Sequence, residues 1–298
     1  MNYIFDYLRS FKQALEEGIF IKEDVSLVSS KENLARKVFS KRQVNIIKSI
    51  YIFFRGNNFF LDNRRNLIRK LLLKYCDSPI KSIRKVVNYM IDENDFDKIE
   101  YALCFGIYDD IAFENQISKT YDVPVFAADP TEISIKTMLN YNKKENFTYM
   151  PVALDINNEY KRFYNTLGND TESNIKSGSL QNINNNEDYI EVECINLEKI
   201  MDILNLENLG NTLLKMDIEG GALPVLEDLL KPGKDKSSLL PKQIAVEIEV
   251  PKVDSKAMFE IVNRADTLLS KLSEFYKIYN IPRLKRYKNI EVLLVRNN

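Results

Sequence analysis

From about residue 99 onward, short apolar runs rich in Val, Ile, Tyr and Phe alternate with segments of helical spacing. Runs of this length suit strands, and strands separated by helices are typical of an α/β fold with a mostly parallel sheet. Residues 168–188 and 231–241 are rich in Asn, Ser, Gly or Pro and are expected to be loops. The strands are expected at residues 100–105, 123–128, 147–154, 189–195, 211–216, 243–249, 274–280 and 290–295.

The first 95 residues have a different pattern and a different charge. Apolar residues recur there at helical spacing, which predicts a helical region. Ser78-Pro79 offers an N-cap and a proline at the first helical position, which predicts a further helix over residues 80–90. Residues 31–90 contain 15 Lys and Arg but 3 Asp and Glu. This charge shift predicts two domains, a basic helical region over 1–95 and an α/β domain over 96–298.

The basic region has three possible roles. Its aromatic residues, such as Tyr51, Phe53 and Phe60, lie among the positive charges. Such a mixture is found on nucleic-acid-binding surfaces and on helices that lie on membranes. More often, aromatics at helical spacing are core residues and the lysines form a solvated face. We therefore favour a helical cap or an acceptor-recognition module, with peripheral membrane contact and nucleic-acid binding as less favoured alternatives.

The chain contains no histidine. This excludes Ser-His-Asp and Cys-His catalytic groups, histidine zinc sites and any histidine general base. Cys76, Cys104 and Cys194 are far apart and form no C-x-x-C pair, so neither a zinc ribbon nor a disulfide framework is expected. The N-terminus lacks the apolar core of a signal peptide, and no uncharged apolar stretch is long enough for a transmembrane helix. We therefore expect a cytoplasmic protein.

Two residues that follow the first two predicted strands suit a nucleotide-like ligand. Gly106 follows the first strand, and a glycine there permits a tight turn and close approach of a ligand to the backbone. Asp129 ends the second strand, where an acid suits hydrogen bonding to a ribose diol. Tyr108 and Ile111 occupy the later positions of G-x-G-x-x-G, which argues against a dinucleotide. An ordinary turn at Gly106 and a plain helix cap at Asp129 are the alternatives.

Four acids are associated with the fifth and sixth predicted strands. Asp217 and Glu219 follow the fifth strand, and Glu247 and Glu249 lie in the sixth. Residues two apart on a strand share a face, and sequential strands are often neighbours, so the four carboxylates are expected to converge. They would bind a divalent cation, or one of them would have a raised pKa and act as a general base. A helix cap at Asp217 and a solvated strand face at Glu247 are the alternatives.

Seven segments follow one another along the chain: CFGIYDDIAFE, VFAADPT, MPVALD, INLEKIMDIL, LLKMDIEGGALPVLE, PKQIAVEIE and IEVLLVR. In this order they resemble the FkbM-type methyltransferases of the class I, S-adenosylmethionine-dependent superfamily. The resemblance covers about residues 98–296, and K-x-D-I-E-G, here starting at Lys215, is its most distinctive motif. It implies a Rossmann-like, seven-stranded sheet between helices, with the last strand antiparallel.

The resemblance also implies how S-adenosylmethionine would be held. The turn formed by Phe105, Gly106 and Ile107 would cradle the methionine part of the cofactor. Asp129, followed by Pro130, would bind the ribose hydroxyls. The turn around Ala153, after the third strand, would lie near the adenine. The resemblance assigns no residue to a metal ion.

Asp217 and Glu219 would border the site of methyl transfer. Three positions depart from the family pattern: Tyr108 stands at the second glycine of the cofactor loop, Ala222 replaces the final acid of D-x-E-G-[AS]-E, and Glu249 stands where a histidine is often found. Glu249 would then replace that histidine as the base. Family members commonly methylate hydroxyl oxygens, often on sugars or secondary metabolites. The resemblance therefore implies an O-methyltransferase that acts on a hydroxyl of a glycan or glycan precursor.

Two alternative functions are also compatible with the sequence. The departures at Ala222 and Glu249 are compatible with a catalytically inactive, methyltransferase-like binding module that uses the basic helices as its interaction surface. A nicotinamide-dependent oxidoreductase on a similar sheet is a weaker rival, because the second and third glycines of its motif are missing.

Overall fold

The computed structural model describes residues 59–78, 80–141, 146–165, 178–182, 187–250, 255–280 and 289–297. Residues 60–298 form one compact unit. Most of the predicted basic helical region, including every helix expected before residue 59, lies outside the described residues. Among the described residues, no helix is both long enough and apolar enough to cross a membrane.

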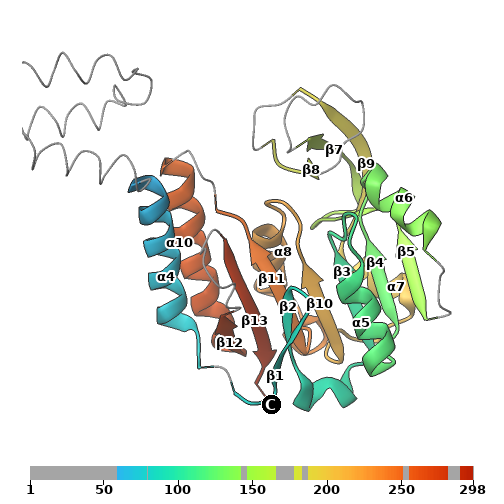
Figure 1. Ribbon diagram of the computed structural model, residues 1–298, viewed down its shortest axis with the longest axis horizontal. Coiled ribbons are helices and arrows are strands. Elements are labelled where there is room, and N and C mark those ends of the chain that lie inside the picture. The colour runs from blue at the N-terminus through green and yellow to red at the C-terminus, as the bar shows by residue number, and fades with distance from the viewer. Residues whose placement is uncertain are drawn as a thin grey trace, which may run out of the picture. The chain divides into compact units, whose positions relative to one another are not determined.

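A mixed sheet of seven strands forms the centre of this unit (Figure 1). Five neighbouring strands, β11, β10, β3, β4 and β5, run parallel to one another. The last strand of the chain, β13, is antiparallel to its neighbours β11 and β12. The predicted α/β class and the antiparallel last strand are therefore confirmed. In spatial order the strands are β12 (Tyr276–Asn280), β13 (Ile290–Arg296), β11 (Gln243–Ile248), β10 (Thr212–Met216), β3 (Tyr101–Phe105), β4 (Val125–Ala128) and β5 (Phe147–Met150).

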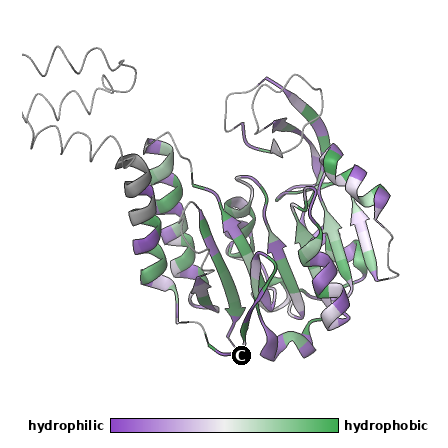
Figure 2. Cartoon of the chain, in the orientation of Figure 1, coloured by the Kyte–Doolittle hydropathy of each residue, from purple (hydrophilic) through white to green (hydrophobic). Residues whose placement is uncertain are grey.

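Helices cover both faces of this sheet (Figure 1). Because the inner strands are buried on both faces, their sequences are almost continuously apolar, and they appear mainly green in Figure 2. Successive residues of a strand point to opposite faces, so Ala102 and Cys104 of β3 belong to one hydrophobic core and Leu103 and Phe105 to the other. The helices are α4 (Phe59–Tyr75), η1 (Glu93–Lys98, a 3-10 helix), α5 (Ala112–Tyr121), α6 (Glu132–Asn140), α7 (Leu197–Leu204), α8 (Ala222–Leu229), α9 (Lys236–Leu239) and α10 (Ser255–Leu272).

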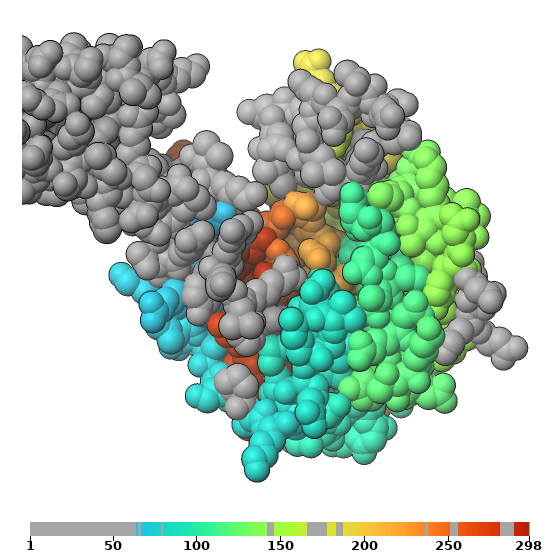
Figure 3. Space-filling view, in the orientation of Figure 1, coloured from blue at the N-terminus to red at the C-terminus, as the bar shows by residue number. Residues whose placement is uncertain are grey.

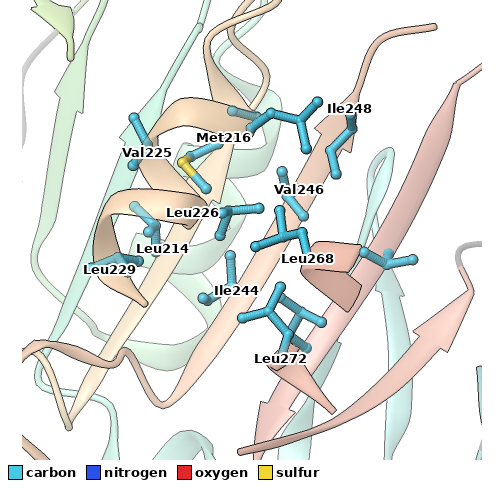
Figure 4. Packing of buried hydrophobic residues seen from close by; sticks show 14 of the residues in the cluster. Leu214, Met216, Val225, Leu226, Leu229, Ile244, Val246, Ile248, Leu268 and Leu272 are labelled. Carbon is cyan, nitrogen blue, oxygen red and sulfur yellow. The ribbon is translucent and has the colours of Figure 1, made fainter. Parts of the chain in front are cut away.

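The larger core lies between the sheet and helices α8 and α10, where side chains of β10, β11, α8 and α10 pack together (Figure 4). Burial of these side chains removes apolar surface from water, which is the main favourable contribution to folding. Figure 4 labels Leu214, Met216, Val225, Leu226, Leu229, Ile244, Val246, Ile248, Leu268 and Leu272.

Helix α4 lies beside α10 (Figure 1). Its apolar residues Ile68, Leu71 and Leu72 are buried in the larger core. At its C-terminal end, the Tyr75 hydroxyl donates a hydrogen bond of 2.7 Å to Oδ1 of Asp266 on α10. Although α4 precedes residue 95, it is therefore packed as part of the same compact unit as the sheet.

The predicted helix over residues 80–90 is wrong. The chain there forms an antiparallel hairpin of β1 (Ile83–Val86) and β2 (Tyr89–Asp92), with Val87 at φ 51° in the turn. The Gln243 side chain donates to the Asp92 carbonyl oxygen at 2.8 Å and accepts from the Asp92 N–H at 2.9 Å. All four residues of β2 are buried. Docking on the central sheet, together with several β-branched residues, thus outweighs the local helix signals.

A second, four-stranded sheet was not predicted. Residues 189–195 do form a strand, but it belongs to this sheet, and the third predicted strand divides at Pro151 into β5 and β6. The strand over residues 159–165 is largely polar and partly exposed, so it lacks an apolar run. Each predicted loop also contains a short element, β8 in 168–188 and α9 in 231–241. The order is β6 (Ala153–Leu154), β9 (Tyr189–Ile195), β7 (Glu159–Asn165) and β8 (Gly178–Ser179).

Candidate functional site

A cavity of about 370 Å³ opens at the carboxyl ends of β3, β4 and β10. This is the edge at which ligands bind in open α/β sheets. In the space-filling view, the orange segment after β10 lies next to the green segment after β3 (Figure 3). The lining combines apolar walls with a few polar groups, as is usual for small-molecule sites. It consists of Gly106, Tyr108, Ala128, Asp129, Pro130, Thr131, Val152, Ala153, Leu154, Phe163, Gly178, Ser179, Leu180, Asp217, Ile218, Glu219 and Gly221.

Gly106 is required for two separate reasons. Its φ of 75° lies in the left-handed region that side chains disfavour. A Cβ at this position would also lie 1.8 Å from the carbonyl oxygen of Asp217. The neighbouring backbone is tied to both adjacent strands, because the Gly106 N–H donates to Ala128 and the Asp217 N–H donates to Phe105. The strand-to-helix turn predicted here is therefore a close crossing of two backbone segments.

Lys215, the first residue of K-x-D-I-E-G, anchors this crossing from inside the protein. Its Nζ donates a hydrogen bond of 2.6 Å to the Gly106 carbonyl oxygen and lies 3.5 Å from the Glu114 carboxylate. Both Lys215 and Glu114 are buried. Although burial lowers the pKa of Lys215, the negative charges of Glu114 and Asp217 raise it overall. Burial raises the pKa of Glu114 despite the opposing charge of Lys215.

Asp129 joins the segments that follow β3 and β4. Its Oδ2 accepts a hydrogen bond from the Tyr108 N–H at 3.0 Å. Its Oδ1 accepts from the Thr131 N–H at 2.8 Å and from the Thr131 hydroxyl at 2.6 Å. Thr131 in turn is the N-cap of α6. The predicted helix cap is thus Thr131, and Asp129 supports it while also lining the cavity.

Tyr108 occupies the position at which the nucleotide-binding pattern has its second glycine. Its φ of 50° is in the left-handed region, so a residue with a side chain adopts there the backbone conformation that glycine adopts freely. The conformation is held from two sides, because Asp129 accepts from the Tyr108 N–H and the Ser134 hydroxyl donates to the Tyr108 carbonyl oxygen at 2.8 Å. Its side chain is part of the cavity lining.

The four predicted carboxylates do converge. The pKa of Glu249 is raised to about 9, first by burial and then by its hydrogen bond to Glu219, with the charges of Glu247 and Asp217 adding to the rise. Burial and the hydrogen bond to Glu219 thus favour the protonated form of Glu249, in which it donates that hydrogen bond. A protonated carboxyl group cannot accept a proton, so Glu249 would act as a base only after losing this proton. Among the residues that the structure describes, no cluster of acidic or cysteine side chains is arranged to hold a metal ion.

The neighbours of the other two carboxylates were not predicted. The Asn289 side chain donates a hydrogen bond to Glu247. The hydroxyl of Tyr89, a residue of the hairpin, donates to Oδ2 of Asp217. Both partners are remote in sequence, so no local pattern could have identified them.

Residues 178–181 cross the turn that follows β10, and no sequence pattern predicts this contact. The Ser179 hydroxyl donates a hydrogen bond of 2.5 Å to the Glu219 carbonyl oxygen. The Gln181 side chain donates to the Gly220 carbonyl oxygen at 2.9 Å. The second sheet thus supplies one wall of the cavity and fixes the backbone next to Glu219.

Most of the predicted site residues come together at the cavity. Phe105 and Ile107 are buried and do not line it, so their side chains support the turn from the core. Glu249 lies behind Glu219 and is also absent from the lining. Ala222 begins α8 and is buried in the larger core, where an acid would lack solvent. The predicted residues that line the cavity are Gly106, Asp129, Pro130, Ala153, Asp217 and Glu219.

A family model matches more than half of the chain. It is described as the methyltransferase FkbM domain and matches residues 93–275. None of the curated proteins compared with the sequence matches it significantly.

Similar solved structures include the plantazolicin methyltransferase BpumL in complex with S-adenosylhomocysteine. It is 13% identical with a TM-score of 0.29, over 92% of this chain and 97% of that one. Another is a putative O-methyltransferase from Nostoc punctiforme, 9% identical with a TM-score of 0.32, over 80% of this chain and 69% of that one. Because these scores are low, the identification rests on the family match.

Proposed function

The chain belongs to the methyltransferase FkbM domain family, and from that premise we propose that it methylates a hydroxyl oxygen of a glycan or glycan precursor. It is an S-adenosylmethionine-dependent methyltransferase. The proposal concerns the acceptor and the roles of individual residues. The observation that carries it is the cavity at the sheet edge, in which a carboxylate after β4 and two carboxylates after β10 line the same space.

The cavity fits the nucleoside part of S-adenosylmethionine. Val152, Ala153, Leu154 and Phe163 give one side an apolar wall that suits an adenine ring. Asp129 has two carboxylate oxygens with about four acceptor sites, of which three are used by Tyr108 and Thr131. Acceptor capacity is therefore left for a ribose hydroxyl. We assign Asp129 to ribose binding, with Pro130 and Ala153 beside it.

The Gly106 turn would hold the methionine part. Its carbonyl oxygen is fixed by Lys215, and its lack of a side chain leaves the backbone accessible at the cavity. Phe105 and Ile107 contribute their buried side chains to the position of the turn. A turn fixed before the ligand arrives does not have to be ordered on binding, which favours affinity.

Asp217 and Glu219 would serve the acceptor. S-adenosylmethionine, when bound, supplies an electrophilic methyl carbon. The residues of this chain then have to hold the acceptor oxygen in line with that carbon and take up the hydroxyl proton. Asp217 and Glu219 line the cavity and can accept hydrogen bonds from hydroxyl groups, which sugars offer in number. Glu249 would act behind Glu219, as a donor that orients its carboxylate.

Two further parts of the proposal rest mainly on the sequence. We assign the protein to the cytoplasm, since its three cysteines are unpaired. We assign the basic region, residues 1–95, to acceptor recognition, with contact to a membrane surface as the alternative.

Thermal unfolding with excess S-adenosylmethionine, S-adenosylhomocysteine or NAD tests the cofactor assignment. A ligand at 100 times its Kd stabilises the native state by about 2.7 kcal/mol. For a chain of this size the midpoint should rise by roughly 5–10 °C. We expect this shift with the two methionine-derived ligands and none with NAD. A shift with NAD alone would support the oxidoreductase, and a shift without methyl transfer to any hydroxyl acceptor would support the inactive binding module.

Asp129→Ala tests the site. The variant should fold but show no midpoint shift with S-adenosylhomocysteine, because the proposed ribose acceptor is gone. Asp266→Ala is a control: the Asp266 carboxylate also accepts a hydroxyl hydrogen bond, from Tyr75, but it lies on α10 and outside the cavity lining. It should keep the full shift. Retained binding in Asp129→Ala would overturn the assignment of the ribose site.

A further inference from the structure

The hairpin β1–β2 precedes the segment that matches the family model, yet it reaches the carboxylates of the proposed site. The match begins at residue 93, and β2 ends at Asp92. Tyr89 lies in β2, is buried and donates its hydroxyl hydrogen bond to Oδ2 of Asp217. Since Asp217 lines the cavity, a residue from outside the matched domain contacts a residue that we place at the methyl-transfer site.

Two contacts hold the Tyr89 ring, and a third fixes its hairpin. The ring packs in a T-shaped arrangement with Phe113 of α5, with ring centroids 5.1 Å apart at 68°. The Lys215 ammonium, on β10, lies 5.1 Å from the Tyr89 ring centroid. The hairpin itself is fixed to β11 by the paired hydrogen bonds between Gln243 and Asp92. The hydroxyl therefore has little freedom to turn away from Asp217.

The charges around the phenol favour its protonated form. Burial, and then the negative charge of Asp217, raise the pKa of Tyr89, and its hydrogen bond to Asp217 and the charges of Glu247 and Glu114 act in the same direction. The charged groups that face it are Lys215 on β10, Asp217 just after β10, Glu247 on β11 and Glu114 on α5. Tyr89 is thus a hydrogen-bond donor, and the carboxylate is the acceptor.

We propose that Tyr89 is a positioning residue of the methyl-transfer site, which holds one oxygen of Asp217 and turns the other toward the acceptor. The inference rests on the proposed function. It assigns a role to the hairpin: the segment ahead of the family domain completes the site by supplying the donor that orients Asp217. Removal of the hydroxyl would leave the carboxylate without this constraint.

The test uses tyrosine labelled with 13C at Cζ, whose NMR signals report on each phenol without a known acceptor. The full chain has 16 tyrosines, and Tyr89→Phe assigns the Tyr89 signal by its loss. Asp217→Asn should move the Tyr89 signal and leave that of Tyr75 in place, because Tyr75 donates to Asp266 instead. Addition of S-adenosylhomocysteine should also move the Tyr89 signal, through the contact of Asp217 with the cavity.

The NMR signals of Tyr108 and Tyr149 show whether a negative result contradicts this inference or the proposed function. Tyr108 lines the cavity, and the Tyr149 hydroxyl donates to the Asp129 carbonyl oxygen, so both should respond to S-adenosylhomocysteine. If they respond and Tyr89 does not, the positioning role is overturned and cofactor binding stands. If none responds, the proposed function itself fails. A Tyr89 signal that is unchanged in Asp217→Asn would also overturn the inference.

The affinity of Tyr89→Phe for S-adenosylhomocysteine distinguishes positioning from general support of the fold. Tyr89 does not line the cavity, so the affinity should change by less than about threefold, or under 0.7 kcal/mol. Tyr75→Phe is the matched control, since it removes another tyrosine-to-aspartate hydrogen bond. A large loss of affinity in Tyr89→Phe alone would assign the residue to cofactor binding rather than to Asp217.

Discussion

The carboxylates at the two ends of the cavity receive their hydrogen bonds from different kinds of donor. At the end that follows β3 and β4, which we propose binds the cofactor and call the cofactor end, Asp129 accepts two backbone N–H groups and one hydroxyl. At the end that follows β10 and β11, which we propose binds the acceptor and call the acceptor end, carboxylates lie near other carboxylates. Their donors include the Tyr89 hydroxyl, the Asn289 side chain and the protonated Glu249. The cofactor end is therefore fixed by backbone geometry, whereas the acceptor end depends on where protons reside.

The largest loss of stability should come from a substitution at Gly106, where the backbones of the two ends meet. Gly106→Ala places a Cβ 1.8 Å from the Asp217 carbonyl oxygen on a residue with φ of 75°. Because the clash is with backbone, the turn has to open, and we expect a loss of about 4 kcal/mol or more in the free energy of unfolding. Denaturant unfolding measures this loss, and binding of S-adenosylhomocysteine should disappear with it.

Gly233→Ala is the matched control for this change. Gly233 also has a positive φ, 88°, but a Cβ there would meet nothing within 4 Å. The loss should be about 1 kcal/mol, the cost of the backbone conformation alone. Equal losses in the two variants would mean that the close crossing at Gly106 does not matter.

A smaller loss of stability should follow from removal of Lys215, the buried cation that contacts both ends. Lys215→Met leaves Glu114 buried without its cation and the Gly106 carbonyl oxygen without its donor. Removal of one partner of a buried ion pair costs about 3 kcal/mol. The double variant Lys215→Met/Glu114→Gln should recover part of this stability, since no uncompensated carboxylate is left. Chemical unfolding of the two variants gives the difference.

The double variant separates stability from binding. It still lacks the donor to Gly106, so its affinity for S-adenosylhomocysteine, measured by calorimetry, should remain reduced. Full recovery of affinity would show that Lys215 acts only by neutralising Glu114 and has no part in holding the turn.

The same contrast explains what the sequence could predict. Gly106 and Asp129 could be identified because their roles follow from residue type and from position after a strand. The four carboxylates could be placed together because strand periodicity and the order of strands suffice for that. Tyr89 and Ser179 could not be found, since their contacts join segments 128 and 40 residues apart. The hairpin that contains Tyr89 was mistaken for a helix, because its docking through Gln243 is a tertiary effect.

The smallest effect concerns the protons of the acceptor end. The folded pKa of Glu249 is raised to about 9, first by burial and then by Glu219, so the folded state binds more protons than the unfolded state between about pH 4.5 and pH 9. The stability contributed by protonated Glu249 is thus present below the unfolded pKa and is lost as the pH rises through this range. Glu249→Gln keeps a donor for Glu219 but cannot lose a proton. It should therefore be more stable than the unsubstituted protein at pH 8, and this difference should disappear at pH 4.

Glu93→Gln gives the control of opposite sign. Its hydrogen bond from Arg84, followed by that from Tyr121, lowers the pKa of Glu93, so the carboxylate contributes stability above its unfolded pKa. That variant should be less stable than the unsubstituted protein at pH 8 and equal to it at low pH. Urea unfolding at a series of pH values from 4 to 8 compares the two. If Glu249→Gln followed the unsubstituted protein across this range, Glu249 would be ionised in the folded state, and it would then be available as the base that its position in the family motif implies.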